Sequence, residues 1–298
     1  MPVRRRVTPD VSVMTHASTA PHPERFVQQA YAGRTGLLAT LSTLLIVFGF
    51  TWGADLIEQW VVSHGWQSRD SVPGYVVRLA VDIGMCLMST AVAVNFVLKR
   101  PLRSAITDGR PFSLKWIVLG GTMGVCICLP IHMGWLWALQ AHSGLSFHVP
   151  VAGIDPGTWA FFLTLLLLSP LHALGEELIF RGFLTQLLGD VVRARIGLAA
   201  IVALLFALVH DTSWISPTFL AEIFAVSLLF SALTFVSGGI GCAVGYHAAG
   251  NIIINSTHYL VAGLPENKRC CEDAFMWGLT AAHMLIAGAI FLWLARRR

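Results

Sequence analysis

Long apolar stretches recur along almost the whole of this 298-residue sequence, and short polar loops separate them. A helix needs about 17–25 predominantly apolar residues to cross the hydrocarbon core of a bilayer. Charged residues make up only 12% of the chain, which is about half of the ~25% that is usual in a soluble domain. The sequence therefore predicts an integral membrane protein, folded as an all-α bundle of transmembrane helices.

We expect about eight transmembrane helices, because eight segments carry the apolar pattern. The fourth should continue as a helix beyond its apolar part, to about Leu188. The fifth and seventh are shorter than a typical membrane span. The expected spans are residues 37–54, 75–98, 116–139, 159–174, 196–209, 219–236, 239–254 and 274–294.

Basic residues gather in alternate loops, as the positive-inside rule requires of short cytoplasmic loops. Residues 99–115 include five Lys or Arg residues, whereas residues 140–157 and 211–218 include none. We therefore predict that both termini are cytosolic, with residues 1–35 as a polar tail and residues 36–298 as the bundle. Topology thus accounts for the net charge of +4, and we expect no nucleic-acid partner.

Two adjacent carboxylates, Glu176 and Glu177, interrupt the fourth apolar segment, and Arg181 follows four residues after Glu177. Ionisable residues at membrane depth are costly, so they mark a functional site by default. Residues four apart share one helix face, so Glu177 and Arg181 can pair. Glu176 is turned about 100° away, so it can face the interior of the bundle.

Three more polar residues belong to later spans: His210 comes at the end of the fifth, while His247 and Asn251 lie in the seventh. At 1.5 Å of rise per residue, Glu176 and His210 each lie roughly 21 Å from the cytosolic end of their helices. Asn251 lies roughly 18 Å deep and His247 roughly 12 Å deep by the same measure. The sequence therefore predicts that these four side chains, from three helices, meet near the middle of the membrane.

These residue types can hydrolyse an amide bond in two ways. A carboxylate in a low-dielectric cavity can act as the general base that activates water, while an imidazole and an amide donate hydrogen bonds to the developing oxyanion. Alternatively, Glu176, His210 and His247 can bind zinc with an open position for water. The H-E-x-x-H pattern of common zinc proteases is absent.

Together these residues resemble the CPBP family of intramembrane proteases, which includes the CAAX prenyl endopeptidases and the bacterial Abi proteins. Residues 176–181 match the family's E-E-x-x-x-R motif, residues 206–210 match F-x-x-x-H, and residues 247–251 match H-x-x-x-N. The resemblance implies that Glu176 activates water and that His210, His247 and Asn251 complete the site, while Glu177 and Arg181 brace it. It implies a protease core at about residues 157–256, and it admits both a zinc enzyme and a glutamate-dependent one.

From the resemblance we expect a peptide or lipid-modified peptide as substrate, reached from the lipid bilayer of a prokaryotic cytoplasmic (inner) membrane. Two other classes of function remain open. The polar residues could form the proton relay of a proton-coupled transporter. The chain could also be a catalytically idle scaffold or immunity protein that binds a peptide.

Several other residues have simpler interpretations. His172 lies four residues before Glu176 and could form a pair of metal ligands with it, but the family pattern omits this position. We expect the remaining histidines to be interfacial or structural, and the cysteines in apolar segments to be buried thiols. The pair Cys270–Cys271 matches no zinc site. The histidines are His64, His132, His142, His148, His258 and His283, and the cysteines are Cys86, Cys126, Cys128 and Cys242.

Overall fold

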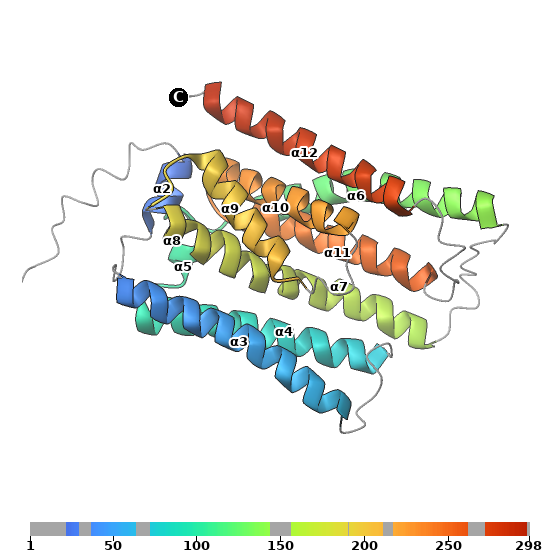
Figure 1. The fold of residues 1–298 in the computed structure, drawn as a ribbon, viewed down its shortest axis with the longest axis horizontal. Helices are drawn as coiled ribbons and strands as arrows, with labels where there is room; N and C mark the ends of the chain where they lie inside the picture. The colour runs from blue at the N-terminus through green and yellow to red at the C-terminus, as the bar shows by residue number, and fades with distance from the viewer. Residues whose placement is uncertain are drawn as a thin grey trace, which may run out of the picture.

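A computed structural model describes residues 22–29, 37–63, 72–143, 156–189, 191–210, 217–261 and 272–296. Within these ranges every long element is a helix and there is no strand (Figure 1), so the predicted polytopic, all-α membrane fold is confirmed. The elements are α2 (His22–Gln28), α3 (Leu37–Ser63), α4 (Val72–Val92), η2 (Ala93–Val97), α5 (Arg103–Ile106), α6 (Leu114–Ser143), α7 (Pro156–Glu177), η4 (Leu178–Leu184), α8 (Thr185–Gly189), α9 (Arg195–Leu208), α10 (Pro217–Ser237), α11 (Gly241–Val261) and α12 (Glu272–Arg296).

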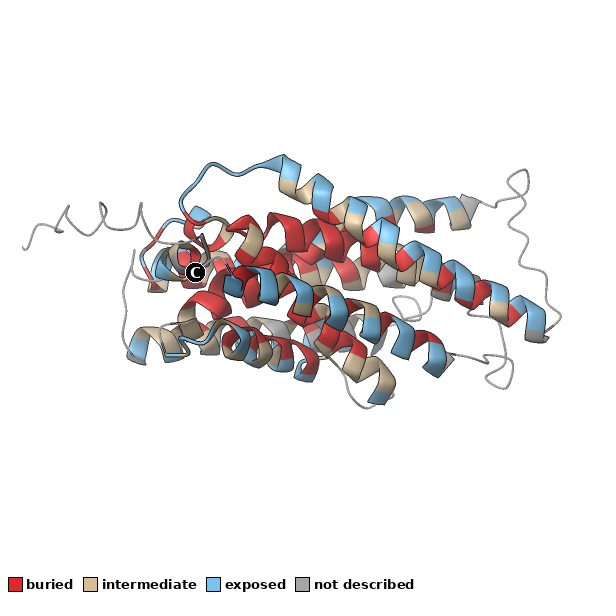
Figure 2. Cartoon of the chain, turned by 90° about the horizontal axis from the view of Figure 1, so that it is seen from above, coloured by how far each residue is buried: buried red, intermediate tan, exposed pale blue. Residues whose placement is uncertain are grey.

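The long helices lie side by side in one elongated bundle (Figure 1). Helices α3 and α4 pack together on one side of it and contact the rest through α7. Helices α6 and α12 form the opposite side, where α6 packs on α11 and α12 packs on α10. Figure 2 shows that the buried residues gather along the middle of the bundle, while the outer helices expose one face. The exposed faces are rich in Leu, Trp and Phe, as expected of helices in contact with lipid.

Each of the eight expected spans coincides with a helix. In the described part of the chain, six helices are long and apolar enough to cross a membrane. Helix α9 is too short, at 14 residues, and α11 carries polar residues that lower its hydropathy. The number of helices that cross the membrane and the cytosolic location of both termini stay predictions. The six candidates cover Leu38–Val61, Val76–Val97, Leu114–Ala141, Gly157–Gly189, Pro217–Ser237 and Asp273–Arg296.

Glycines allow the backbones of α6 and α11 to touch. A methyl group added at Gly120 of α6 would overlap the backbone carbonyl of Cys242 on α11. One added at Gly245 of α11 would likewise overlap the carbonyl of Ile117 on α6. Close approach through small residues is a common way for transmembrane helices to associate. It holds α11, with His247 and Asn251, in a fixed position.

Part of the predicted N-terminal tail packs on the bundle. Phe26 of α2 is fully buried, in a cluster that includes Leu178, Ile240 and Val244. Nη1 of Arg100 also donates to the carbonyl oxygen of Gln29, at 2.9 Å. The tail residues before His22 lie outside the described residues, as do Cys270 and Cys271.

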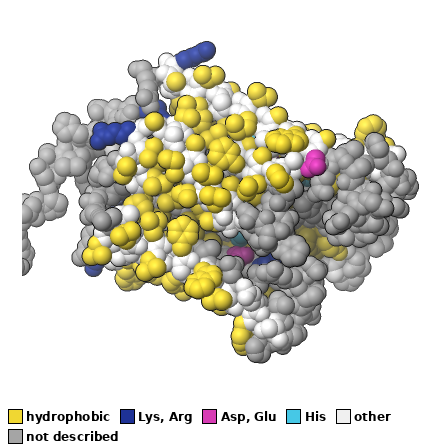
Figure 3. All heavy atoms as spheres, viewed as in Figure 1, with side chains coloured by type: hydrophobic (Ala, Val, Ile, Leu, Met, Phe, Trp, Pro, Cys, Tyr) yellow, Lys and Arg dark blue, Asp and Glu magenta, His cyan; other side chains and the backbone are white. Residues whose placement is uncertain are grey.

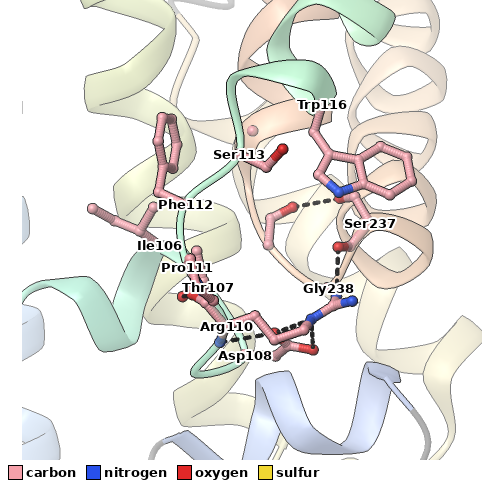
Figure 4. Close-up of a pocket in the computed structure, with 12 residues that line it drawn as sticks. Ile106, Thr107, Asp108, Arg110, Pro111, Phe112, Ser113, Trp116, Ser237 and Gly238 are labelled. Carbon is pink, nitrogen blue, oxygen red and sulfur yellow. Dashed lines mark hydrogen bonds and ion pairs between the residues drawn. The ribbon is translucent and has the colours of Figure 1, made fainter.

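A loop between α5 and α6 clamps the turn that joins α10 to α11 (Figure 4). The backbone N–H of Asp108 donates to the carbonyl of Gly238, and that of Ile240 donates to the carbonyl of Ile106. Arg110 contacts the Asp108 carboxylate at 2.8 Å and the Ser237 carbonyl at 2.9 Å. Gly238 has a φ of +69°, which glycine adopts without steric cost. The clamp fixes the start of α11.

Candidate active site

The helix that carries the first motif changes its winding just after the two glutamates. Helix α7 ends at Glu177, and Leu178–Leu184 continue as a buried π-helical segment before α8. Such wide turns inside a helix are often found at functional sites. The sequence predicted a continuous helix through the motif, which is confirmed, but not this change of winding.

The predicted Glu177–Arg181 pair is present at the centre of the protein. Nη1 of Arg181 donates to Oε1 of Glu177 at 2.9 Å, and both side chains are fully buried. Nη2 of Arg181 donates to the carbonyl and the hydroxyl oxygen of Ser227 on α10. The guanidinium also lies 4.5 Å from the ring centre of Phe206 and 5.0 Å from that of Phe230. Arg181 therefore joins the motif helix to α9 and α10.

Glu177 also fixes the orientation of His247. Oε1 of Glu177 lies 2.9 Å from Nδ1 of His247, and because a carboxylate accepts, Nδ1 must be the donor. The ring of Phe230 stacks on the imidazole, with centres 4.7 Å apart and planes at 20°. These contacts direct Nε2 of His247 toward Glu176, whose Oε2 lies 3.3 Å away.

Glu176 lies at the wall of a cavity of about 150 Å³ between α3, α4, α7 and the end of α9. Its Oε1 is 3.5 Å from Nε2 of His172, one turn earlier on α7. Asp82 and His210 line the same cavity. Figure 3 shows that hydrophobic side chains cover most of the described surface on this face of the bundle and that acidic and histidine side chains are few there. Glu176 is thus the motif carboxylate that a water molecule or a substrate can reach.

His210 lies just beyond the C-terminal end of α9, where its Nδ1 is 2.7 Å from the carbonyl oxygen of Phe206. Since a carbonyl only accepts, Nδ1 is the donor, and Nε2 of the neutral ring keeps its lone pair. His210 lines the cavity beside Glu176 and also a second cavity, of about 280 Å³, between α6, α10, α11 and α12. His247 and Asn251 line this second cavity.

The structure thus brings the predicted site residues together. Glu176, Glu177, Arg181 and His247 form one chain of contacts, while His210 and Asn251 lie on the walls of the two adjoining cavities. Sequence reasoning set His172 aside because the motif omits it, yet His172 contacts Glu176. The spacing of four residues between His172 and Glu176 indicates such a contact, because residues four apart share one helix face.

The predicted zinc ligands were Glu176, His210 and His247. Among the residues that the structure describes, no group of three His, Cys, Asp or Glu side chains is arranged to hold a metal ion. Nδ1 of His247 contacts Glu177, and Nδ1 of His210 is hydrogen-bonded to the Phe206 carbonyl, as in histidines that bind a metal through Nε2. Binding of zinc therefore stays a prediction, and the reaction below is derived for the side chains alone.

Comparison with known proteins agrees with the motifs. Residues 158–253 match the family model described as type II CAAX prenyl endopeptidase Rce1-like. The predicted family resemblance is confirmed. The matched region contains all three motifs, and the match implies a CAAX intramembrane protease in an integral membrane protein.

A curated relative covers more of the chain than the family model does. The uncharacterized protein YyaK of Bacillus subtilis is 26% identical over an alignment of 215 residues, and the alignment covers 67% of this chain and 69% of YyaK. No solved structure matches the chain.

Proposed function

We propose that this protein is an intramembrane endopeptidase that hydrolyses a peptide bond of a membrane-associated or lipid-modified peptide, with Glu176 as the general base. One observation carries the proposal. The accessible carboxylate of Glu176 lies 3.3 Å from Nε2 of His247, and the other nitrogen of that ring is held by the buried Glu177–Arg181 pair. A reactive carboxylate therefore lies beside an imidazole that cannot easily reorient.

In this reaction the water lies in the cavity beside Glu176, and the oxyanion of the peptide forms beside the second cavity. A water molecule between Glu176 and Nε2 of His210 would lose a proton to the Glu176 carboxylate, and its oxygen would attack the carbonyl carbon of the peptide. Asn251, on the wall of the second cavity, can donate its amide N–H to the oxyanion that forms. The C–N bond then breaks as Glu176 returns the proton to the leaving nitrogen.

Glu177 and Arg181 act as positioning residues in this scheme. Both side chains are fully buried, so neither can reach a substrate. Their contribution is to keep Nδ1 of His247 as a donor and the imidazole beside Glu176. His172 contacts the other oxygen of Glu176 and fixes the rotamer of that carboxylate in the same way.

The substrate is expected to be a peptide with an apolar or lipid-modified end. The family description names prenylated CAAX proteins as substrates, and a prenylated peptide is the first compound to test. Both cavities have mainly apolar walls, which suits a substrate that reaches the site from the bilayer.

The test is proteolysis by the purified protein in liposomes, with a quenched peptide library that contains prenylated and unmodified members. We expect wild type to cleave and Glu176→Gln and His210→Ala to lose cleavage. Asp273→Asn is the matched control, because this carboxylate is exposed and accepts from Thr218 away from both cavities.

Retention of cleavage in both site variants would contradict the proposed site. Glu176→Gln also distinguishes the protease from a transporter and from an idle scaffold. In a transporter, Glu176→Gln would abolish a pH-dependent flux without any cleavage by wild type. In an idle scaffold, it would change neither cleavage nor flux.

A further inference from the structure

A second buried polar cluster lines the larger cavity, together with the motif residues His210, His247 and Asn251. Glu222 of α10, Tyr246 of α11 and His283 of α12 are all buried. Nδ1 of His283 is 2.6 Å from Oε1 of Glu222, and Nε2 of His283 is 2.8 Å from the hydroxyl oxygen of Tyr246. None of these residues belongs to the three motifs.

Two hydrogen bonds and one close contact join the members of this cluster. Cys128 donates its S–H to the Tyr246 oxygen, at 3.8 Å. Tyr246 can then donate its O–H to Nε2 of His283, at 2.8 Å. Nδ1 of His283 faces Oε1 of Glu222 at 2.6 Å, although this close contact lacks the geometry of a hydrogen bond.

One acceptor of the cluster is left over. Oε2 of Glu222 has no hydrogen-bond partner among the described residues, although Glu222 is only 5% exposed. A buried carboxylate oxygen without a partner is costly. Glu222 lines the cavity of about 280 Å³ that His210, His247 and Asn251 also line. A molecule bound at the motif residues can therefore extend to Glu222.

We propose that Glu222 is a specificity-determining residue, which binds the ammonium or guanidinium group of a Lys or Arg side chain next to the scissile bond. The proposal rests on the proposed function, since it names the substrate of the same site. Phe219, Ile223 and Met276 line the same cavity. They can cover the aliphatic stem of such a side chain, while Glu222 pairs with its charged end.

His283 and Tyr246 give this subsite its rigidity. Because His283 holds Oε1, the carboxylate can offer only Oε2 to the substrate. A site built to bind a donor rejects an analogue without one, since the buried acceptor would then lose water and gain nothing. An apolar side chain of equal length should therefore be a poor substrate at this position.

The experiment uses pairs of quenched peptides that differ only in Lys or norleucine at one position, placed in turn at each residue beside the scissile bond. For wild type we expect kcat/KM to be at least about tenfold higher for Lys at one of these positions. Glu222→Gln should lose this preference and still cleave the norleucine peptide, whereas Glu222→Asp should keep it. Asp273→Asn is the control, because Asp273 and Thr218 join the same two helices outside the cavity.

Binding of the same peptide pairs to Glu176→Gln, followed by fluorescence anisotropy, separates this proposal from the proposed function. Suppose that wild type does not cleave, that Glu176→Gln binds the Lys peptide preferentially, and that this preference is lost when Glu222→Gln is added. The subsite at Glu222 would then be supported, and the protease activity would be contradicted. Equal cleavage and equal binding of both peptides would overturn the subsite. So would a Glu222→Gln variant that unfolds at lower temperature but keeps the Lys preference, because the cluster would then be structural only.

Discussion

Replacing Arg181 by methionine tests whether the buried ion pair holds the site together. The change removes the hydrogen bond to Glu177, those to Ser227, and the contact of the guanidinium with the Phe206 ring. Glu177 stays fully buried, and among the described residues it then keeps its contact with His247. Breaking a buried pair in this way costs about 3–5 kcal/mol, because an uncompensated charge is left behind.

The free energy of unfolding should therefore fall by that amount in Arg181→Met. At about 2–4 °C per kcal/mol for a chain of this order of size, the melting temperature should drop by roughly 6–20 °C. Adding Glu177→Gln removes the stranded charge, so the double variant should regain about 1–3 kcal/mol of the loss. Thermal unfolding in detergent, followed by the fluorescence of the ten tryptophans, measures all four forms of this cycle.

The result that would refute this reasoning is additivity. If Glu177→Gln and Arg181→Met each destabilise the protein and their effects simply add, the two side chains are not coupled in the folded state. A loss below about 1 kcal/mol in Arg181→Met would have the same meaning, since that is the range of exposed ion pairs.

Three further predictions concern the helix contact, the metal and the topology. Gly120→Ala and Gly245→Ala should each lower the free energy of unfolding by about 1–3 kcal/mol, because the added methyl groups overlap backbone atoms. The control is Gly134→Ala, whose methyl group meets nothing within 4 Å. It should leave thermal unfolding unchanged. A chelator should leave peptide cleavage unchanged, and a loss that zinc restores would instead favour Glu176, His210 and His247 as metal ligands. A protease added to inside-out vesicles should remove a tag from the C-terminus, and a protected tag would contradict the cytosolic location.

Much of the fold could be predicted from the sequence, because apolar length and the cost of charge in lipid are properties of single helices. The same is true of the Glu177–Arg181 pair, which lies within one helix. Glycines spaced four apart, at Gly120 and Gly124 and at Gly241 and Gly245, are typical of faces where helices approach closely, but they do not say which helices are partners.

What could not be predicted depends on contacts between helices. The depths of Glu176 and His247 indicated that they meet, but not that His247 binds both glutamates. His283 seemed an ordinary structural histidine, because Glu222 and Tyr246 lie on other helices and only packing brings them together. Cys126 was expected to be buried and is exposed, since its helix presents that face to the outside.

The central claim is that the Glu176 carboxylate is the base that activates water. The most direct measurement is kcat at saturating peptide for wild type and for Glu176→Gln, with thermal unfolding to show that both are folded. We predict a fall in kcat of about 10²–10⁴-fold, which is typical for loss of a general base, with KM nearly unchanged. A folded Glu176→Gln variant that keeps the wild-type kcat would contradict the account.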